Sequence, residues 1–199
     1  MVDIVVCGVG GQGVLLLAEV LGTAALKNGL DVRVSEIHGM AQRGGSVICH
    51  VRLGKAVHAP TVMDGDADAL VALEPVEALR ALRFASKRTL ALVSTRTIRP
   101  VLVSLGLASY PSLEQVMSAI RGAVGDCFFL DALRLAEEAG SPIAQNMVMA
   151  GALHATGILP VQKEALVEAI EELVPKRFLG VNLRALELGE KAIKEQMPR

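Results

Sequence analysis

Short apolar runs, separated by turn residues and amphipathic stretches, fill the first two thirds of the chain. The runs VDIVVC, DVRVS, ALVAL, TLALVS and CFFL predict buried strands, and VLVSL predicts one more. The stretch from Gln12 to about Asn28 predicts a helix that Gly29 ends, because glycine tolerates positive φ. The order strand, helix, strand at the start of the chain is typical of a βαβ unit with a parallel sheet.

The run SVICHVRLG alternates in polarity, as expected of a strand. One face carries Val47, Cys49, Val51 and Leu53, and the other carries Ser46, His50 and Arg52. We expect the first face to belong to the core and the second to be solvated or covered by a partner. The preceding segment IHGMAQRGG contains three glycines and is predicted to be a loop.

Helical patterns become dominant later in the chain. Pro75 begins a short helix at an allowed position, SLEQVMSAIRGAV is amphipathic, and Asp131 is placed to cap the helix after CFFL. From Pro142 onward only helices are predicted, and NMVMAGALHATG is apolar nearly all round, with small residues that would allow packing against another chain. We therefore predict one domain over 1–199. Its fold class is α/β: a Rossmann-like, doubly wound, mostly parallel sheet core over 1–140 and a helical C-terminal part over 141–199.

Composition narrows the possible functions. The chain has 199 residues, a formal net charge of −1 and 52% hydrophobic residues. Without a basic tract or an aromatic platform, nucleic acid is not an expected partner. The longest apolar run is too short to span a membrane and no signal-peptide pattern is present, so a cytoplasmic location is expected. The high apolar share favours contact with another subunit, including a homo-oligomer of the isolated chain.

No metal site is expected. Cys7, Cys49 and Cys127 lie far apart without a C-x-x-C pair and are predicted to be buried structural thiols. Acidic residues at alternate positions, from Asp64 to Asp68, resemble a calcium loop, but Ala69 and Pro75 stand where that loop needs Gly and Glu. A solvated turn is the better interpretation.

A glycine-rich turn, GVGGQG, follows the first predicted strand. Gly8, Gly10 and Gly13 satisfy G-x-G-x-x-G between a strand and a helix, where glycines permit a tight turn, phosphate approach and close helix packing. Glu36, at the carboxyl end of the second predicted strand, stands roughly where a ribose-binding acid belongs. A stand-alone NAD-type protein is therefore one interpretation of this chain.

A second interpretation comes from four segments taken together: GVGGQG, EIHGMAQRGGSVICHVR, NMVMAGAL opened by Asn146, and VNLRALELG, which contains Asn182. In this combination the chain resembles the gamma-type subunits of 2-oxoacid:ferredoxin oxidoreductases, and most closely the small subunits that act on indolepyruvate. The resemblance implies oxidative decarboxylation of a 2-oxoacid to an acyl-CoA, with electrons passed to ferredoxin. It also implies that thiamine diphosphate and iron–sulfur clusters belong to a large partner subunit, and that the isolated chain is inactive. We expect both asparagines to cap or brace loops.

The two glycine segments are predicted to form one surface that faces the partner and receives part of CoA. Backbone N–H groups at a helix N-terminus attract anions, and an arginine can offer a bidentate fork to phosphate or carboxylate. The residues of this surface are Gly8, Gly10, Gly11, Gln12, Gly13, Arg43, Gly44 and Gly45. The alternative is that both segments are tight turns at a subunit interface. His38 is a weak candidate for acid–base chemistry, and His50 is expected to be structural.

Overall fold

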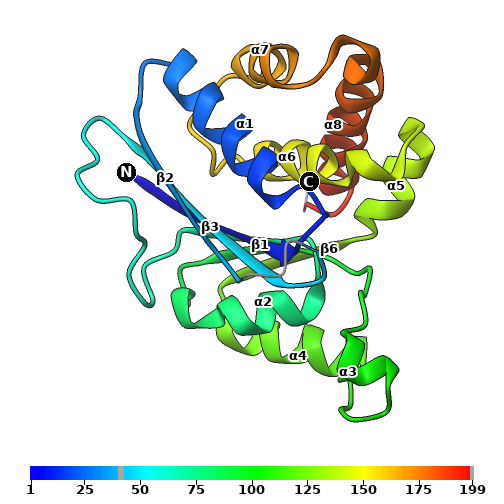
Figure 1. Cartoon of the computed structure of the whole chain (residues 1–199). Coiled ribbons are helices and arrows are strands. Elements are labelled where there is room, and N and C mark those ends of the chain that lie inside the picture. Colours follow the sequence, from blue (N-terminus) through cyan, green and yellow to red (C-terminus); the bar gives the residue numbers. More distant parts are fainter. Residues whose placement is uncertain (40–42, 198–199) are drawn as a thin grey trace.

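A six-stranded sheet runs through the centre of the part of the chain that the computed structural model describes, residues 1–39 and 43–197 (Figure 1). The strand order is β2-β3-β1-β4-β5-β6. The strands are β1 (Val2–Val9), β2 (Asp31–His38), β3 (Ser46–Gly54), β4 (Ala69–Ala72), β5 (Leu90–Ser94) and β6 (Asp126–Leu130). Helices cover both faces, which confirms the predicted α/β fold with a mostly parallel sheet and a helical C-terminal region.

The first βαβ unit differs from the prediction. Strands β1, β4, β5 and β6 pair in parallel, but β3 lies between β1 and β2 and is antiparallel to both. The chain turns back after β2 and inserts β3 beside β1, so β2 becomes an edge strand and the sheet is mixed. β2 also continues through Ile37 and His38, two residues that were predicted to belong to the following loop.

Five helices pack on one face of the sheet (Figure 1). They are α1 (Val14–Lys27), α5 (Ala132–Ala139), α6 (Gln145–Ala155), α7 (Lys163–Leu173) and α8 (Leu179–Lys194), with short 3-10 turns η2 (Pro142–Ala144) and η3 (Lys176–Phe178). The side chains of α6 are buried from Asn146 to Leu153, as its apolar pattern predicts. Its small residues, however, pack against α8 of the same chain: Gly151 lies against the backbone of Leu186, and Gly189 against that of Val148.

The opposite face is covered by α2 (Pro75–Ala81), the 3-10 turn η1 (Leu82–Phe84) and α4 (Leu113–Ala123). Pro75 opens α2 as predicted, and the Asp131 carboxylate accepts a hydrogen bond of 2.9 Å from the amide of Arg134 at the start of α5. The run VLVSL was wrongly predicted to be a strand. It forms the short helix α3 (Val101–Ser104), because β6 already occupies the place beside β5 and Pro100 precedes the run.

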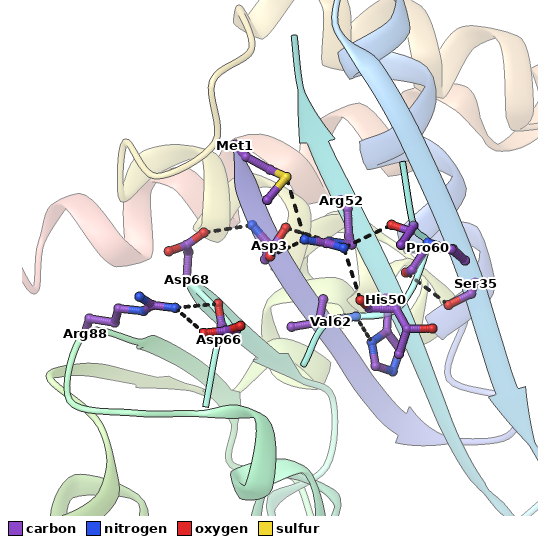
Figure 2. A network of polar contacts seen from close by, with 12 residues as sticks. Met1, Asp3, Ser35, His50, Arg52, Pro60, Val62, Asp66, Asp68 and Arg88 are labelled. Atoms are coloured by element: carbon purple, nitrogen blue, oxygen red, sulfur yellow. Dashed lines mark hydrogen bonds and ion pairs between the residues drawn. The ribbon is translucent and has the colours of Figure 1, made fainter. Parts of the chain in front are cut away.

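The loop between β3 and β4 covers the second face of β3 (Figure 2). Arg52 donates to both carboxylate oxygens of Asp3, at 2.9 and 3.0 Å, and to the carbonyls of Ala59 and Thr61 in the loop. His50 is fully buried, and its Nδ1 accepts a hydrogen bond of 2.9 Å from the amide of Val62. The predicted core face is confirmed, and the opposite face needs no second chain to cover it.

The cysteines lie apart from one another. Cys7 and Cys49 are buried on opposite faces of the sheet, and burial raises the pKa of the Cys49 thiol to about 12. Cys127, on β6, is three strands away from β1 and is only partly buried, contrary to the prediction. In the described part of the chain, no helix is long and apolar enough to cross a membrane.

Candidate functional site

The glycine turn joins β1 to α1, and two of its glycines meet close neighbours. A Cβ on Gly8 would lie 2.9 Å from both the Gln12 side chain and Val14. Gly13 has φ +79°, a conformation that L side chains rarely adopt, and precedes the first turn of α1. Its carbonyl oxygen accepts a hydrogen bond of 3.2 Å from the buried amide of Asn146 on α6. Asn146 therefore braces the turn, as predicted.

Gln12 holds the turn against the sheet from inside. Only 4% of its surface is exposed; Oε1 accepts from the amide of Val9 at 2.8 Å, and Nε2 donates to the carbonyl of Leu73 at 2.9 Å. Leu73 follows β4, and the helices after β1 and β4 cover opposite faces of the sheet. Open α/β proteins bind ligands in the crevice at such a switch point. Here the Gln12 side chain bridges that crevice, so space for a ligand lies elsewhere around the turn.

The structure brings the two predicted glycine segments together. The amide of Gly10 donates a hydrogen bond of 2.8 Å to the carbonyl of Gly45, and the amide of Gly44 donates to the carbonyl of Gly10 at 3.3 Å. Arg43 is exposed in the turn that contains Gly44. Residues 40–42 of the HGMAQRGG segment lie outside the described residues. Arg43 and the glycine turn therefore belong to one surface at the carboxyl edge of β1.

A cavity of about 430 Å³ opens beside the joined loops. Its lining is Val9, Gly10, Gly11, Gly13, Val14, Leu15, His38 and Val47. His38 reaches it because it pairs with Val47, which in turn pairs with Gly8, and opposite residues of antiparallel strands share a face. Among these residues His38 alone has a polar side chain, so the cavity suits an apolar group with a single polar contact.

The N-terminus of α1 adds backbone donors to the same surface. No side chain of the described residues caps the helix at Gly13, and its first turn contains no acidic residue. Such a terminus carries partial positive charge, and its N–H groups point outward along the helix axis. The arrangement can therefore hold an anionic or carbonyl oxygen, with Arg43 on the adjoining loop.

Two buried carboxylates were not predicted: Glu77, which contacts the residue that follows the Arg43–Gly45 loop, and Glu74, at the start of α2. Glu77, on α2, accepts hydrogen bonds from the Ser46 hydroxyl and from Arg80, and Ser46 directly follows the Gly44–Gly45 pair. Glu74 caps α2 through the amide of Glu77 at 2.9 Å and accepts a hydrogen bond from the Tyr110 hydroxyl. A sequence signal for this pair exists: an acid before Pro75, followed three residues later by a second acid, resembles a helix-capping pattern.

The carboxylates also affect nearby groups. Burial, followed by the charges of Glu77 and Glu74, raises the pKa of the Cys7 thiol well above its ordinary value. Burial and the hydrogen bond to Glu74 raise the pKa of Tyr110. Both groups are therefore neutral near pH 7, and neither provides a thiolate or phenolate for chemistry.

The geometry does not favour NAD binding. Glu36 was expected at the end of a strand beside β1, but β2 continues beyond it to His38 and is separated from β1 by β3. Adjacent strands lie about 4.8 Å apart, so two strand spacings separate β2 from β1. A ribose held by the glycine turn would need an acid on the neighbouring strand. Glu36 does not occupy that place.

The described residues contain no group of three His, Cys, Asp or Glu side chains that could hold a metal ion. Asp66 and Asp68, from the predicted acidic turn, have other partners. Asp66 pairs with Arg88 at 2.8 Å, and Asp68 accepts the amide of Asp3 at 2.8 Å (Figure 2).

Comparison with known proteins identifies the family. The profile of the pyruvate ferredoxin/flavodoxin oxidoreductase family matches residues 3–192. The chain is 46% identical over 196 residues to the indolepyruvate oxidoreductase subunit IorB of Thermococcus kodakarensis, covering 98% of this chain and 97% of that subunit. It is also 46% identical over 196 residues to the IorB subunit of Pyrococcus horikoshii, with the same coverage.

A solved structure agrees in fold. The gamma subunit of a keto/oxoacid ferredoxin oxidoreductase from Geobacter sulfurreducens superposes with a TM-score of 0.71 over 98% of this chain and 99% of that one, at 24% sequence identity. The chain belongs to the pyruvate ferredoxin/flavodoxin oxidoreductase family, as a subunit of the gamma type.

Proposed function

We propose that the chain is the small subunit of an indolepyruvate ferredoxin oxidoreductase. The observation that carries the proposal is its 46% identity, over nearly the full length of both chains, to subunits named for indolepyruvate oxidation. In this role it supports the CoA-dependent oxidative decarboxylation of an aryl 2-oxoacid to an acyl-CoA. The large subunit passes the electrons to ferredoxin, and the isolated small subunit is inactive. The cytoplasmic location remains a prediction from the sequence.

Thiamine diphosphate and the iron–sulfur clusters are assigned to the large subunit. The chemistry of this chain's side chains supports that division. Clusters need several thiolates at one place, whereas Cys7 and Cys49 lie on opposite faces of the sheet with raised thiol pKa values. The chain's own contribution is then a surface that the large subunit completes.

That surface is the edge formed by the glycine turn and the Arg43–Gly45 loop. Its backbone donors suit oxygen acceptors, and the Arg43 guanidinium suits phosphate or carboxylate. We infer that this edge faces the thiamine site of the large subunit and receives part of CoA. The competing interpretation, close-packed turns at the subunit interface, uses the same residues without a ligand.

Arg43→Ala in the assembled enzyme separates these interpretations. If Arg43 binds CoA, removal of a charge-assisted contact raises the apparent KM for CoA about tenfold or more and leaves subunit association intact. Arg88→Ala is the matched control. Arg88 is an exposed arginine that precedes β5, so it lies at the amino ends of the parallel strands, whereas the glycine turn lies at their carboxyl ends. An unchanged KM for CoA would exclude the ligand role of Arg43.

The enzymatic role itself is tested by co-expression with a large subunit. The expected product is a brown complex that oxidises indolepyruvate in the presence of CoA and reduces ferredoxin. The purified small subunit is also titrated with NADH while nicotinamide fluorescence is followed. Tight NADH binding, without assembly into such a complex, would support a stand-alone dinucleotide-binding protein instead.

A further inference from the structure

The cavity beside the glycine turn has a chemical character that the family alone does not specify. Its walls are the side chains of Val9, Val14, Leu15 and Val47, and its remaining lining is glycine backbone and His38. An added Cβ on Gly11 would meet no atom within 4 Å, so this side of the cavity is open. A ligand group that enters here meets aliphatic surface on several sides and one imidazole.

The contact between His38 and Gly39 favours one tautomer of the imidazole. Its Nδ1 lies 3.2 Å from the carbonyl oxygen of Gly39, and a carbonyl oxygen only accepts hydrogen bonds. In the tautomer with its hydrogen on Nδ1, this contact is a hydrogen bond and Nε2 keeps a lone pair. The cavity thus combines aliphatic walls with one polar side chain, an imidazole whose Nε2 can accept a hydrogen bond in that tautomer.

We infer that this cavity receives the aryl side chain of the 2-oxoacid and that Nε2 of His38 accepts the hydrogen bond of an indole N–H. An indole ring is flat, apolar and carries one donor, which complements this lining. His38 is then a specificity-determining residue and takes no part in bond breaking. The inference rests on the proposed function, because it assigns to this subunit a pocket for the substrate named in its relatives.

The position of the cavity agrees with the reaction. Transfer of the acyl group to CoA requires the CoA sulfur to reach the acyl carbonyl carbon, which carries the aryl side chain. Gly10 lines the cavity and is also hydrogen bonded to Gly44 and Gly45 of the loop proposed to contact CoA. The aryl group and CoA would therefore occupy neighbouring parts of one surface.

The test compares two substrates that differ in the donor. Phenylpyruvate has an aromatic side chain without an N–H, whereas indolepyruvate has one. In the assembled enzyme at saturating CoA, His38→Leu removes the acceptor and His38→Gln retains one. His58→Leu is the matched control, because His58 is exposed in the loop that covers β3 and does not line the cavity.

We expect His38→Leu to lower kcat/KM for indolepyruvate about tenfold, mainly through KM, while the value for phenylpyruvate stays within about twofold of the parent enzyme. His38→Gln should keep most of the preference for indolepyruvate, and His58→Leu should keep all of it. Co-purification of each variant with the large subunit shows that assembly is intact.

Three results would overturn the inference: equal losses for both substrates, an effect on the KM for CoA alone, or no effect. A failure of the proposed function looks different. In that case the parent complex itself would not oxidise indolepyruvate, whatever residue stands at position 38.

Discussion

Gly13 and Asn146 are separated by 133 positions in the sequence, yet the Cβ that Gly13 lacks would lie 2.5 Å from Nδ2 of Asn146. Nδ2 of Asn146 also donates a hydrogen bond to the Gly13 carbonyl. The backbone amide of Met147 donates to Oδ1 of Asn146 at 3.0 Å. The start of α6 therefore fixes the start of α1. Glycine is required at position 13 for two reasons, its positive φ and this close approach.

Gly13→Ala is expected to lower the free energy of unfolding by more than a positive φ alone explains. Gly29→Ala provides the comparison, because Gly29 has φ +74° and no atom within 4 Å of an added Cβ. We expect a loss of about 1 kcal/mol for Gly29→Ala and about 1–2 kcal/mol more for Gly13→Ala. Urea unfolding of both variants measures the difference, and equal losses would exclude the steric role of Asn146.

The core of this fold could be predicted from local patterns, and its edges could not. Continuous apolar runs such as Leu90–Ser94 predict buried strands because both of their faces meet helices. The run at Val101 is equally apolar, yet it forms a helix with no buried residue, since β6 already occupies the place beside β5. Likewise, nothing local in Asp31–His38 shows that β3 will insert between β2 and β1. Strand order depends on distant pairings.

The candidate site follows the same division. The GVGGQG and RGG segments could be predicted to be turns because glycine permits tight backbone conformations. In the structure the two segments are joined through Gly10 and Gly45. The contact of Glu77 with Ser46 could not be predicted, because it depends on α2 packing beside Ser46 from another part of the chain. The participation of His38 in the cavity depends on the register of β2 against β3.

The buried His50 predicts a pH-dependent stability. Burial, followed by the charges of Arg83 and Arg52, lowers its pKa in the folded protein. In the unfolded chain the histidine pKa is about 6.5. As the pH falls, position 50 therefore binds a proton more readily in the unfolded chain than in the folded one. The contribution of His50 to the free energy of unfolding is therefore complete above the unfolded-state pKa. It decreases as the pH falls below that value, by at most about 1.4 kcal/mol per pH unit for one proton.

His50→Asn tests this dependence, because the Asn oxygen can still accept from the Val62 amide and does not titrate near neutral pH. The variant is expected to be less stable at pH 7.5 but to lose less stability between pH 7.5 and pH 5.5 than the parent chain. Urea unfolding midpoints at both pH values provide the measurement. Parallel losses in parent and variant would show that other groups control the acid sensitivity.

The close contact between α6 and α8 predicts a large loss of stability when either of its glycines is replaced. An added Cβ on Gly151 would overlap the carbonyl oxygen of Leu186, and one on Gly189 would overlap that of Val148, so the two helix backbones touch directly. Backbone atoms cannot rotate away as a side chain does, and Gly151→Ala must push the helices apart. We expect a loss of about 3 kcal/mol or more.

Gly180→Ala is the matched control. Gly180 lies in the first turn of α8 with no atom within 4 Å of an added Cβ, and helix propensity then favours alanine by about 1 kcal/mol. Opposite signs for the two substitutions, measured by urea unfolding, would support direct helix contact, whereas a neutral Gly151→Ala would contradict it.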